Sequence, residues 1–259
     1  MRLTNRRRLA IMGASGLLGA DLVTALKPFY IVTSITKQNY KRFKGRSFDI
    51  FINANGNSKR FWANLNPVED FAASTDSVIR SIFDFPCGIY IYISSPDVYI
   101  NHSDPKFTKE NAHVDPEKLE PYGLHKHLSE LIVKKYAKKY LILRSANILG
   151  SNLKKGPIYD ALNSDKLFIT LRSQLQFISA FAIAEIIETL LKKPVKNEVV
   201  NVGGQGTFSF GKLEKLVKKK LKVSANAKTQ IYEMNINKIK RIYPSLKTSE
   251  EYLQEYLLK

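Results

Sequence analysis

Short apolar runs alternate along this chain with longer stretches in which apolar residues recur at helical spacing. The apolar runs, typical of strands buried on both faces, occupy residues 8–12, 30–36, 48–54, 89–93, 140–144 and 198–202. Helical periodicity occupies residues 20–26, 67–85, 122–139 and 181–191. Because strands and helices alternate, as right-handed crossover connections require, the chain is predicted to be an α/β protein with a Rossmann-type, doubly wound parallel sheet.

The pattern is less regular outside these segments. Residues 101–120 are polar and contain Pro105 and Pro116, so they are predicted to form a loop. Beyond Gly150 the periodic segments become short, which predicts a small C-terminal lobe folded against the edge of the sheet. Within residues 122–139, one apolar stripe is formed by Leu124, Leu128, Leu131, Ile132 and Tyr136.

The first apolar run leads directly into three glycines and then into a helical segment. Gly13 permits a tight turn, Gly16 lets the backbone approach a pyrophosphate, and Gly19 lets the helix pack close to the strand. The backbone N–H groups and the positive end of the helix favour an anion. This strand–turn–helix context predicts a dinucleotide site, and the alternative is a bare turn without a ligand.

The end of the second predicted strand faces the adenosine ribose in a dinucleotide fold. An Asp or Glu there would accept a hydrogen bond from the ribose 2′-OH, but this chain has Thr36 and Lys37. A lysine without a carboxylate suits a 2′-phosphate, so the expected cofactor is NADP or NAD, with NADP favoured. The alternative is that Lys37 is a surface lysine of the loop.

Composition sets the expected compartment. The single Cys87 excludes an internal disulfide framework, and no apolar run approaches the roughly 18–20 residues that span a bilayer. Arg6, Arg7 and Arg8 precede apolar residues, which raises the alternative of a twin-arginine export signal. That segment contains the three glycines and then Asp21, which favours a strand and turn instead. We expect a cytoplasmic protein without membrane contact.

The formal net charge of +18 would suit nucleic acid, an anionic membrane surface or anionic substrates. The lysine clusters lie on the polar sides of helical patterns, which favours solvated helix faces over a nucleic-acid surface. No zinc-finger, RNA-binding or helix-turn-helix pattern accompanies them. The histidines at 102, 113, 125 and 127 form no ligand pattern, because His125 and His127 diverge on a helix, so no metal is expected.

One pair of residues has the spacing of acid–base chemistry. Tyr122 and Lys126 lie four residues apart at the start of a predicted helix and therefore share a face. An ammonium favours a neighbouring phenolate and lowers its pKa, which suits proton transfer at a carbinol oxygen during hydride transfer. The alternative is ordinary packing of two helix residues.

Taken together, five segments resemble the extended branch of the short-chain dehydrogenase/reductase superfamily, the NAD-dependent epimerases, dehydratases and reductases of nucleotide sugars. They occur in the family's order across about residues 8–204 and comprise 13–19 (GASGLLG), 92–99 (YISSPDVY), 121–126 (PYGLHK), 143–150 (LRSANILG) and 200–203 (VNVG).

The resemblance implies a role for each matching residue. Tyr122 is the implied catalytic acid/base, Lys126 lowers its pKa and binds the nicotinamide ribose, and Ser95 is the catalytic serine. Asn147 is implied at the substrate. Asp97 stands where some dehydratases place an acidic residue near the sugar, and the alternative is that it is an unrelated loop carboxylate. The implied cofactor-binding residues, together with those derived above, are Gly13, Ser15, Gly16, Leu17, Leu18, Gly19, Thr36, Lys37, Ala54, Asn55, Ser94, Tyr122 and Lys126.

The chain departs from the family at the substrate. Leu175 stands where the family has an arginine that clamps the nucleotide diphosphate. Arg172 or another basic side chain would replace it, or the substrate is not a typical nucleotide sugar. Pro96 stands where many dehydratases carry an acidic residue, which argues against a full dehydratase set.

These observations divide the chain into an NAD(P)-binding Rossmann domain, residues 1–150, and a small substrate-binding lobe, residues 151–259, interleaved with the last sheet elements. The leading hypothesis is an NAD(P)-dependent epimerase or reductase acting on a nucleotide-activated sugar in polysaccharide biosynthesis. The alternative is a non-catalytic dinucleotide-sensing protein whose basic surface binds nucleic acid or a protein partner. The resemblance also implies a homodimer through the helices that flank the sheet.

Overall fold

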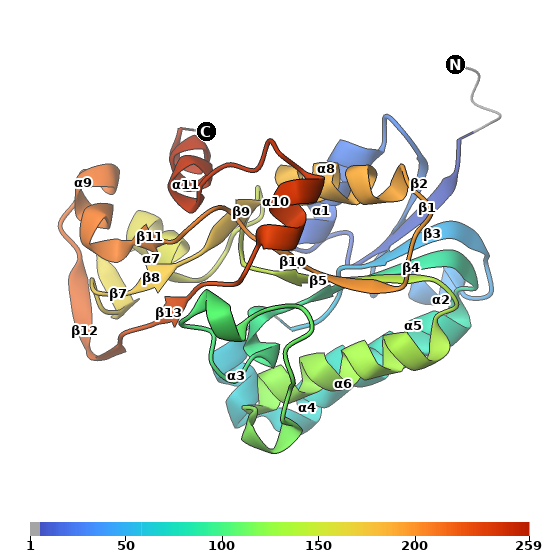
Figure 1. Ribbon diagram of the computed structural model, residues 1–259, viewed down its shortest axis with the longest axis horizontal. Helices are drawn as coiled ribbons and strands as arrows, with labels where there is room; N and C mark the ends of the chain where they lie inside the picture. Colours follow the sequence, from blue (N-terminus) through green and yellow to red (C-terminus); the bar gives the residue numbers. More distant parts are fainter. Residues whose placement is uncertain (1–5, 58, 259) are drawn as a thin grey trace.

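A parallel sheet runs through the centre of the computed structural model, which describes residues 6–57 and 59–258 (Figure 1). Within those residues it has six strands, in the order β2 (Ile31–Ile35), β1 (Arg8–Met12), β3 (Phe48–Asn53), β4 (Cys87–Ser94), β5 (Tyr140–Ser145) and β10 (Glu198–Val202). Each neighbouring pair is parallel. The predicted α/β class and doubly wound sheet are confirmed.

The strand order places a switch point beside β1. Met12 at the end of β1 pairs with Ile35 of β2 on one side and with Asn53 of β3 on the other. The chain therefore passes from β1 to β2 on one side and then crosses to β3 on the other side of β1. Ligands of open α/β sheets bind at such a point, outside the carboxyl ends of the strands.

Helices cover both faces of the sheet (Figure 1). On one face lie α1 (Leu17–Leu26), α8 (Ala180–Leu191) and α10 (Asn237–Ile242). On the other lie α4 (Pro67–Phe71), α5 (Ser77–Asp84) and α6 (Pro121–Tyr136), while the short α2 (Tyr40–Phe43) and α3 (Arg60–Leu65) follow β2 and β3. The segment 67–85 was predicted as one helix, but a π-helical turn, Ala72–Asp76, separates α4 from α5.

The stripe predicted along α6 is not its buried face. Leu131 and Tyr136 are 44% and 47% exposed. The buried residues of α6 are instead Tyr122, Gly123, His125, Lys126, His127, Ser129, Glu130 and Val133. Polar side chains occupy this face because each finds a partner beneath the helix, as described below.

The C-terminal part adds small sheets beside the central one (Figure 1). Its strands are β6 (Asn147–Leu149) with β9 (Phe177–Ser179), β7 (Lys166–Ile169) with β12 (Lys222–Lys228), and β8 (Gln174–Leu175) between β11 (Phe208–Ser209) and β13 (Ile231–Tyr232). Its further helices are α7 (Pro157–Asn163), α9 (Leu213–Val217) and α11 (Ser249–Leu257). The buried rings of Phe177, Phe208 and Phe210 pack together at its centre.

The two predicted domains share the central sheet. β10 comes from the C-terminal half and pairs with β5 of the N-terminal half. The first five residues of the predicted 1–150 domain, and Lys259 of the lobe, lie outside the described residues. Among the helices of the described part, none has the length and apolar character needed to cross a membrane.

Candidate active site

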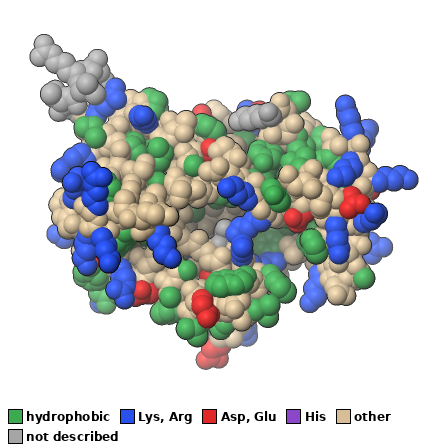
Figure 2. Space-filling model, turned by 180° about the vertical axis from the view of Figure 1, so that it is seen from behind, with side chains coloured by type: hydrophobic (Ala, Val, Ile, Leu, Met, Phe, Trp, Pro, Cys, Tyr) green, Lys and Arg blue, Asp and Glu red, His purple; other side chains and the backbone are tan. Residues whose placement is uncertain are grey.

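A cavity of about 1330 Å³ opens at the carboxyl edge of the sheet. Its walls come from the glycine turn after β1, the loops after β2, β3, β4 and β5, the start of α6, and strands of the C-terminal lobe. Figure 2 shows a hollow in this face of the molecule, with Lys and Arg side chains around it. The cavity therefore lies at the switch point beside β1.

The glycine turn has the shape of a phosphate cradle. Gly13 has a φ of +82°, and an added Cβ would lie 2.8 Å from the Ala54 carbonyl oxygen, so only glycine fits. An added Cβ on Gly16 would meet only the Gly13 oxygen, at 3.1 Å, which leaves its cavity side open. Gly19 does not line the cavity, and its absent Cβ lets α1 approach the turn. These observations fit a dinucleotide pyrophosphate at the start of α1.

The loop after β2 presents lysines and no carboxylate to the cavity. The Thr36 N–H donates to Asn39 Oδ1 at 2.8 Å, and Asn39 Nδ2 donates to the Ser34 carbonyl at 3.0 Å, which fixes the turn. Thr36, Lys37 and Lys41 all line the cavity. Lys41 was not singled out from the sequence, because only the fold of α2 brings it beside Lys37.

Tyr122 lies in the first turn of α6 and is 7% exposed. Its N–H donates to Asn64 Oδ1 at 3.1 Å, which joins α6 to α3. Burial raises the pKa of Tyr122, and Asp97 raises it further, while the Ser95 hydroxyl acts in the opposite direction. The sequence predicted that Lys126 lowers the pKa of Tyr122; in the folded chain this pKa is raised, chiefly by burial.

Lys126 lies one turn after Tyr122 on the same face. Its ammonium donates to the Ile93 carbonyl at 3.1 Å and lies 5.1 Å from the centre of the Tyr92 ring. Burial lowers the pKa of Lys126 to about 8, against the opposing effect of Asp70 and other carboxylates. The ammonium thus stands at the end of β4, at the floor of the cavity.

Ser95 and Asp97 form a compact polar group above β4. The Ser95 hydroxyl donates to Asp97 Oδ2 at 2.7 Å. Asp97 Oδ1 accepts hydrogen bonds from Arg60 Nη1 at 3.1 Å and from the Tyr232 hydroxyl at 3.0 Å. Arg60 and Tyr232 also line the cavity, and Asp97 therefore joins the start of α3 to the C-terminal lobe.

Ser94 lines the cavity but its hydroxyl points to the interior. It donates to Glu130 Oε1 at 2.6 Å, and Arg144 donates to both oxygens of Glu130, at 2.9 and 2.6 Å. Burial opposes the charge of Glu130, but Arg144 outweighs it and lowers the pKa of this carboxyl. The group ties β4, β5 and α6 together behind the site.

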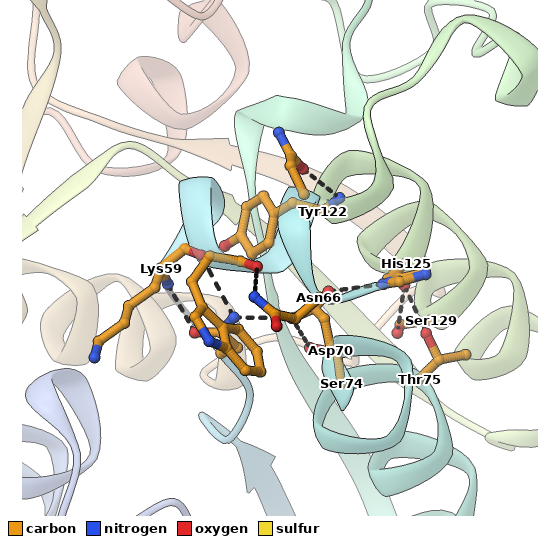
Figure 3. Close-up of polar contacts among 11 residues, drawn as sticks. Lys59, Asn66, Asp70, Ser74, Thr75, Tyr122, His125 and Ser129 are labelled. Atoms are coloured by element: carbon orange, nitrogen blue, oxygen red, sulfur yellow. Dashed lines mark hydrogen bonds and ion pairs between the residues drawn. The ribbon is translucent and has the colours of Figure 1, made fainter. Parts of the chain in front are cut away.

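A second buried group lies beneath α6 (Figure 3). His125 Nδ1 lies 2.7 Å from Asp70 Oδ2, and Asp70 Oδ1 accepts from Asn57 Nδ2 at 3.0 Å and from the Ser74 hydroxyl at 3.4 Å. Asp70 is fully buried. This group connects the loop after β3 with the π-helical turn and with the turn of α6 that carries Tyr122 and Lys126. His125 is thus a partner of Asp70. The sequence around His125 did not indicate this contact.

Most of the predicted site residues meet in the one cavity. Besides those above, Ser15, Leu17, Leu18, Ala54, Asn55 and Asn147 line it. Arg172 does not line it and is exposed. Sequence reasoning missed Lys41, Lys59, Arg60, Lys155 and Tyr232, which lie in short helices, loops and a short strand without a motif.

Comparison with known proteins identifies the class. The model of the NAD dependent epimerase/dehydratase family matches residues 9–203. The chain therefore belongs to the NAD-dependent epimerase/dehydratase family, which confirms the resemblance. No curated protein sequence matches the chain.

Solved structures of this class share the fold across the whole chain. dTDP-4-dehydrorhamnose reductase from Bacillus anthracis in complex with NADP has a TM-score of 0.78 at 18% identity, covering 98% of this chain and 99% of that one. UDP-glucuronic acid 4-epimerase from Bacillus cereus, in complex with UDP-glucuronic acid and NAD, has 0.77 at 16%, covering 97% and 99%. UDP-glucose 4-epimerase from Thermotoga maritima with UDP-glucose has 0.74 at 16%, covering 97% of each.

Proposed function

We propose that this protein is an NAD(P)-dependent oxidoreductase or epimerase that acts on a nucleotide-activated sugar. The observation that carries the proposal is the meeting of Ser95, Tyr122 and Lys126 with the glycine turn in one cavity. A dinucleotide-sensing protein would need the turn alone, so the three further residues favour catalysis. The similar structures with NADP, NAD and UDP-sugars support the same class of ligands.

The proposed cofactor is a nicotinamide dinucleotide with its pyrophosphate on the turn at Gly13 and Gly16. Lys37 and Lys41 suit the 2′-phosphate of NADP, and the cavity has no carboxylate in the described loop after β2 to accept from a free 2′-OH. When bound, the nicotinamide supplies or accepts a hydride. Lys126 would hold the nicotinamide ribose, and Ala54 and Asn55 would border the dinucleotide.

In the proposed mechanism, Ser95 and Tyr122 hold the reacting oxygen of the sugar and Tyr122 moves its proton. A raised pKa keeps the Tyr122 phenol protonated at neutral pH, so it is ready to donate to a carbonyl oxygen that receives a hydride at its carbon. The charged Lys126 stabilises the phenolate that remains.

The C-terminal lobe is the proposed substrate side. Leu153, Leu175, Phe177, Gln230 and Tyr232 line the cavity from this part of the chain. Asp97 and Asn147 face the same space from the sheet edge. In this proposal, residues before the division at 150 would contact mainly the dinucleotide and residues after it mainly the sugar. Both parts contribute strands to the central sheet.

A homodimer through the sheet-flanking helices remains part of the proposal. Phe83 of α5 and Tyr136 of α6 lie in ring contact, with centroids 5.4 Å apart, and are 63% and 47% exposed. Leu131 is exposed nearby on α6. A second copy covering these apolar side chains would remove them from water.

Replacing Tyr122 tests the mechanism. Tyr122→Phe removes the transferable proton and keeps the ring, so turnover of a nucleotide 4-ketosugar with NADPH should fall by at least about 100-fold. Affinity for NADPH, measured by nicotinamide fluorescence, should stay within about twofold of wild type. Unchanged turnover would remove Tyr122 from the acid/base role.

A further inference from the structure

The cavity contains more positive charge than a dinucleotide site requires. Its basic lining residues are Lys37, Lys41, Lys59, Arg60, Lys126 and Lys155. Among the described lining residues, Asp97 is the single carboxylate. A cleft lined by one sign of charge attracts the opposite charge, so the cavity favours ligands with several negative charges.

Two of these cations already have partners. Arg60 pairs with Asp97, and Lys126 donates to the Ile93 carbonyl. Lys37 and Lys41 follow β2, where the 2′-phosphate of a dinucleotide would lie. Lys59 and Lys155, here called the lysine pair, come from elsewhere: Lys59 precedes α3 and Lys155 precedes α7 in the C-terminal lobe.

The lysine pair lacks a neutralising partner. Within residues 6–57 and 59–258, neither ammonium has a hydrogen-bond acceptor or a carboxylate in salt-bridge distance. Burial, together with the smaller effect of the Lys59 charge, lowers the pKa of Lys155 to about 8. The Lys59 ammonium points away from Tyr122 and from the Asp70–His125 group (Figure 3). Two cations that repel each other in a partly dry cavity are a favourable place for an anion.

The position of the missing family arginine supports the same interpretation. Leu175 lines the cavity and is 2% exposed, so a neutral side chain fills that place. Arg172, the substitute considered from the sequence, lies outside the cavity lining. A phosphate-bearing substrate must therefore find its cation elsewhere, and the lysine pair is the available one.

Two aromatic residues that closely follow Lys59 in the sequence line the same cavity. Phe61 and Trp62 of α3 line the cavity and are 79% and 38% exposed. Exposed rings at a cavity mouth offer flat apolar faces to a planar ligand. Cations next to such rings suit a nucleotide, with the phosphates on the lysines and the base against a ring.

We propose that Lys59 and Lys155 bind the diphosphate of the sugar substrate, in place of an arginine at position 175. This inference rests on the proposed function and makes its substrate class specific: a sugar linked to a nucleoside diphosphate, and not a free sugar or polyol. One lysine comes from the Rossmann side and the other from the lobe. The diphosphate would therefore bridge the two sides of the cavity.

Binding of nucleoside diphosphates tests the inference without turnover. UDP, dTDP and inorganic pyrophosphate are titrated by calorimetry into the full chain, with and without saturating NADPH, so that the dinucleotide site is blocked in one series. Lys59→Gln and Lys155→Gln should each weaken UDP binding about tenfold, the loss of one hydrogen bond to a charged group. The matched control is Lys154→Gln, because Lys154 is exposed and does not line the cavity.

The charge of Lys155 gives a second readout. Its pKa is lowered to about 8, so UDP affinity should fall as the pH rises through that value, and Lys155→Gln should flatten the fall. NADPH affinity should be the same in all three variants.

Three results would overturn the inference. In the first, the Lys59 and Lys155 variants bind UDP as tightly as Lys154→Gln does. In the second, the Lys59 and Lys155 variants lose affinity for NADPH instead of UDP. In the third, a wild-type chain that binds NADPH binds none of the three probes. Each leaves the proposed dinucleotide chemistry intact. Failure of the wild type to bind NADPH or NADH would contradict the proposed function itself, whatever the lysine pair binds.

Discussion

At the scale of single residues, the candidate site depends on polar side chains that are buried beneath α6. Asp70 accepts from Asn57 and Ser74 and pairs with His125, so three segments converge on one carboxylate. His125 lies between Tyr122 and Lys126 on α6. The Asp70 group therefore fixes the turn that carries both proposed catalytic side chains.

Removing Asp70 should destabilise the protein and disturb the site. Asp70→Ala leaves the buried Ser74 and His125 and the half-buried Asn57 without their acceptor, which should lower the free energy of unfolding by about 3 kcal/mol. Chemical denaturation measures this change. Glu69→Ala, an exposed neighbour on the same helix, should change it by less than about 0.5 kcal/mol. Equal effects of the two substitutions would show that the Asp70 group contributes no special stability.

The sequence indicated the residues of this site that follow a motif. Tyr122 and Lys126 were predicted because helical spacing puts them on one face and because residues 121–126 resemble the family's motif. Arg60 and Tyr232 were missed, since they reach Asp97 across 37 and 135 residues of chain. Contacts of that separation follow from tertiary packing, which no local spacing encodes.

At the scale of elements, the unit of β1, the glycine turn and α1 does two separable things. Gly19 allows α1 to pack, because an added Cβ would lie 2.0 Å from the Gly13 oxygen. Gly16 leaves space toward the cavity. The three glycines thus divide between folding and ligand binding.

Two substitutions in this unit should separate these roles. Gly19→Ala forces backbone apart and should lower the free energy of unfolding by about 2 kcal/mol. Gly16→Val should leave thermal stability near that of wild type while it reduces NADPH affinity by at least about 100-fold, because its branches enter the space for the pyrophosphate. Thermal denaturation and nicotinamide fluorescence give the two readouts. A stable Gly16→Val variant with normal affinity would place the dinucleotide elsewhere.

The elements of the sheet were predictable because buried parallel strands are continuous apolar runs. Residues 198–202 were predicted as a strand, and β10 has those bounds. The face of α6 was not predictable in the same way. Its buried residues include Lys126 and Glu130, whose partners Ile93 and Arg144 belong to other elements. A rule that buries apolar residues fails where polar groups are satisfied beneath a helix.

At the scale of the whole molecule, the chain order and the charge act on the same place. The order in which the strands are added to the sheet reverses at β1, and the cavity lies at this point. Basic side chains from both halves of the chain line the cavity. The net charge of +18 suggested solvated helix faces from the sequence. The fold shows that part of it lines the cavity, where it suits anionic ligands.

The most direct test of the account is a fluorescence titration of the purified protein with NADPH and with NADH. The account predicts saturable binding of both, with NADPH about tenfold tighter because Lys37 and Lys41 lie where the 2′-phosphate would be. Failure to bind either dinucleotide would contradict the assignment of the cavity and, with it, the proposed chemistry of Tyr122, Lys126 and Ser95.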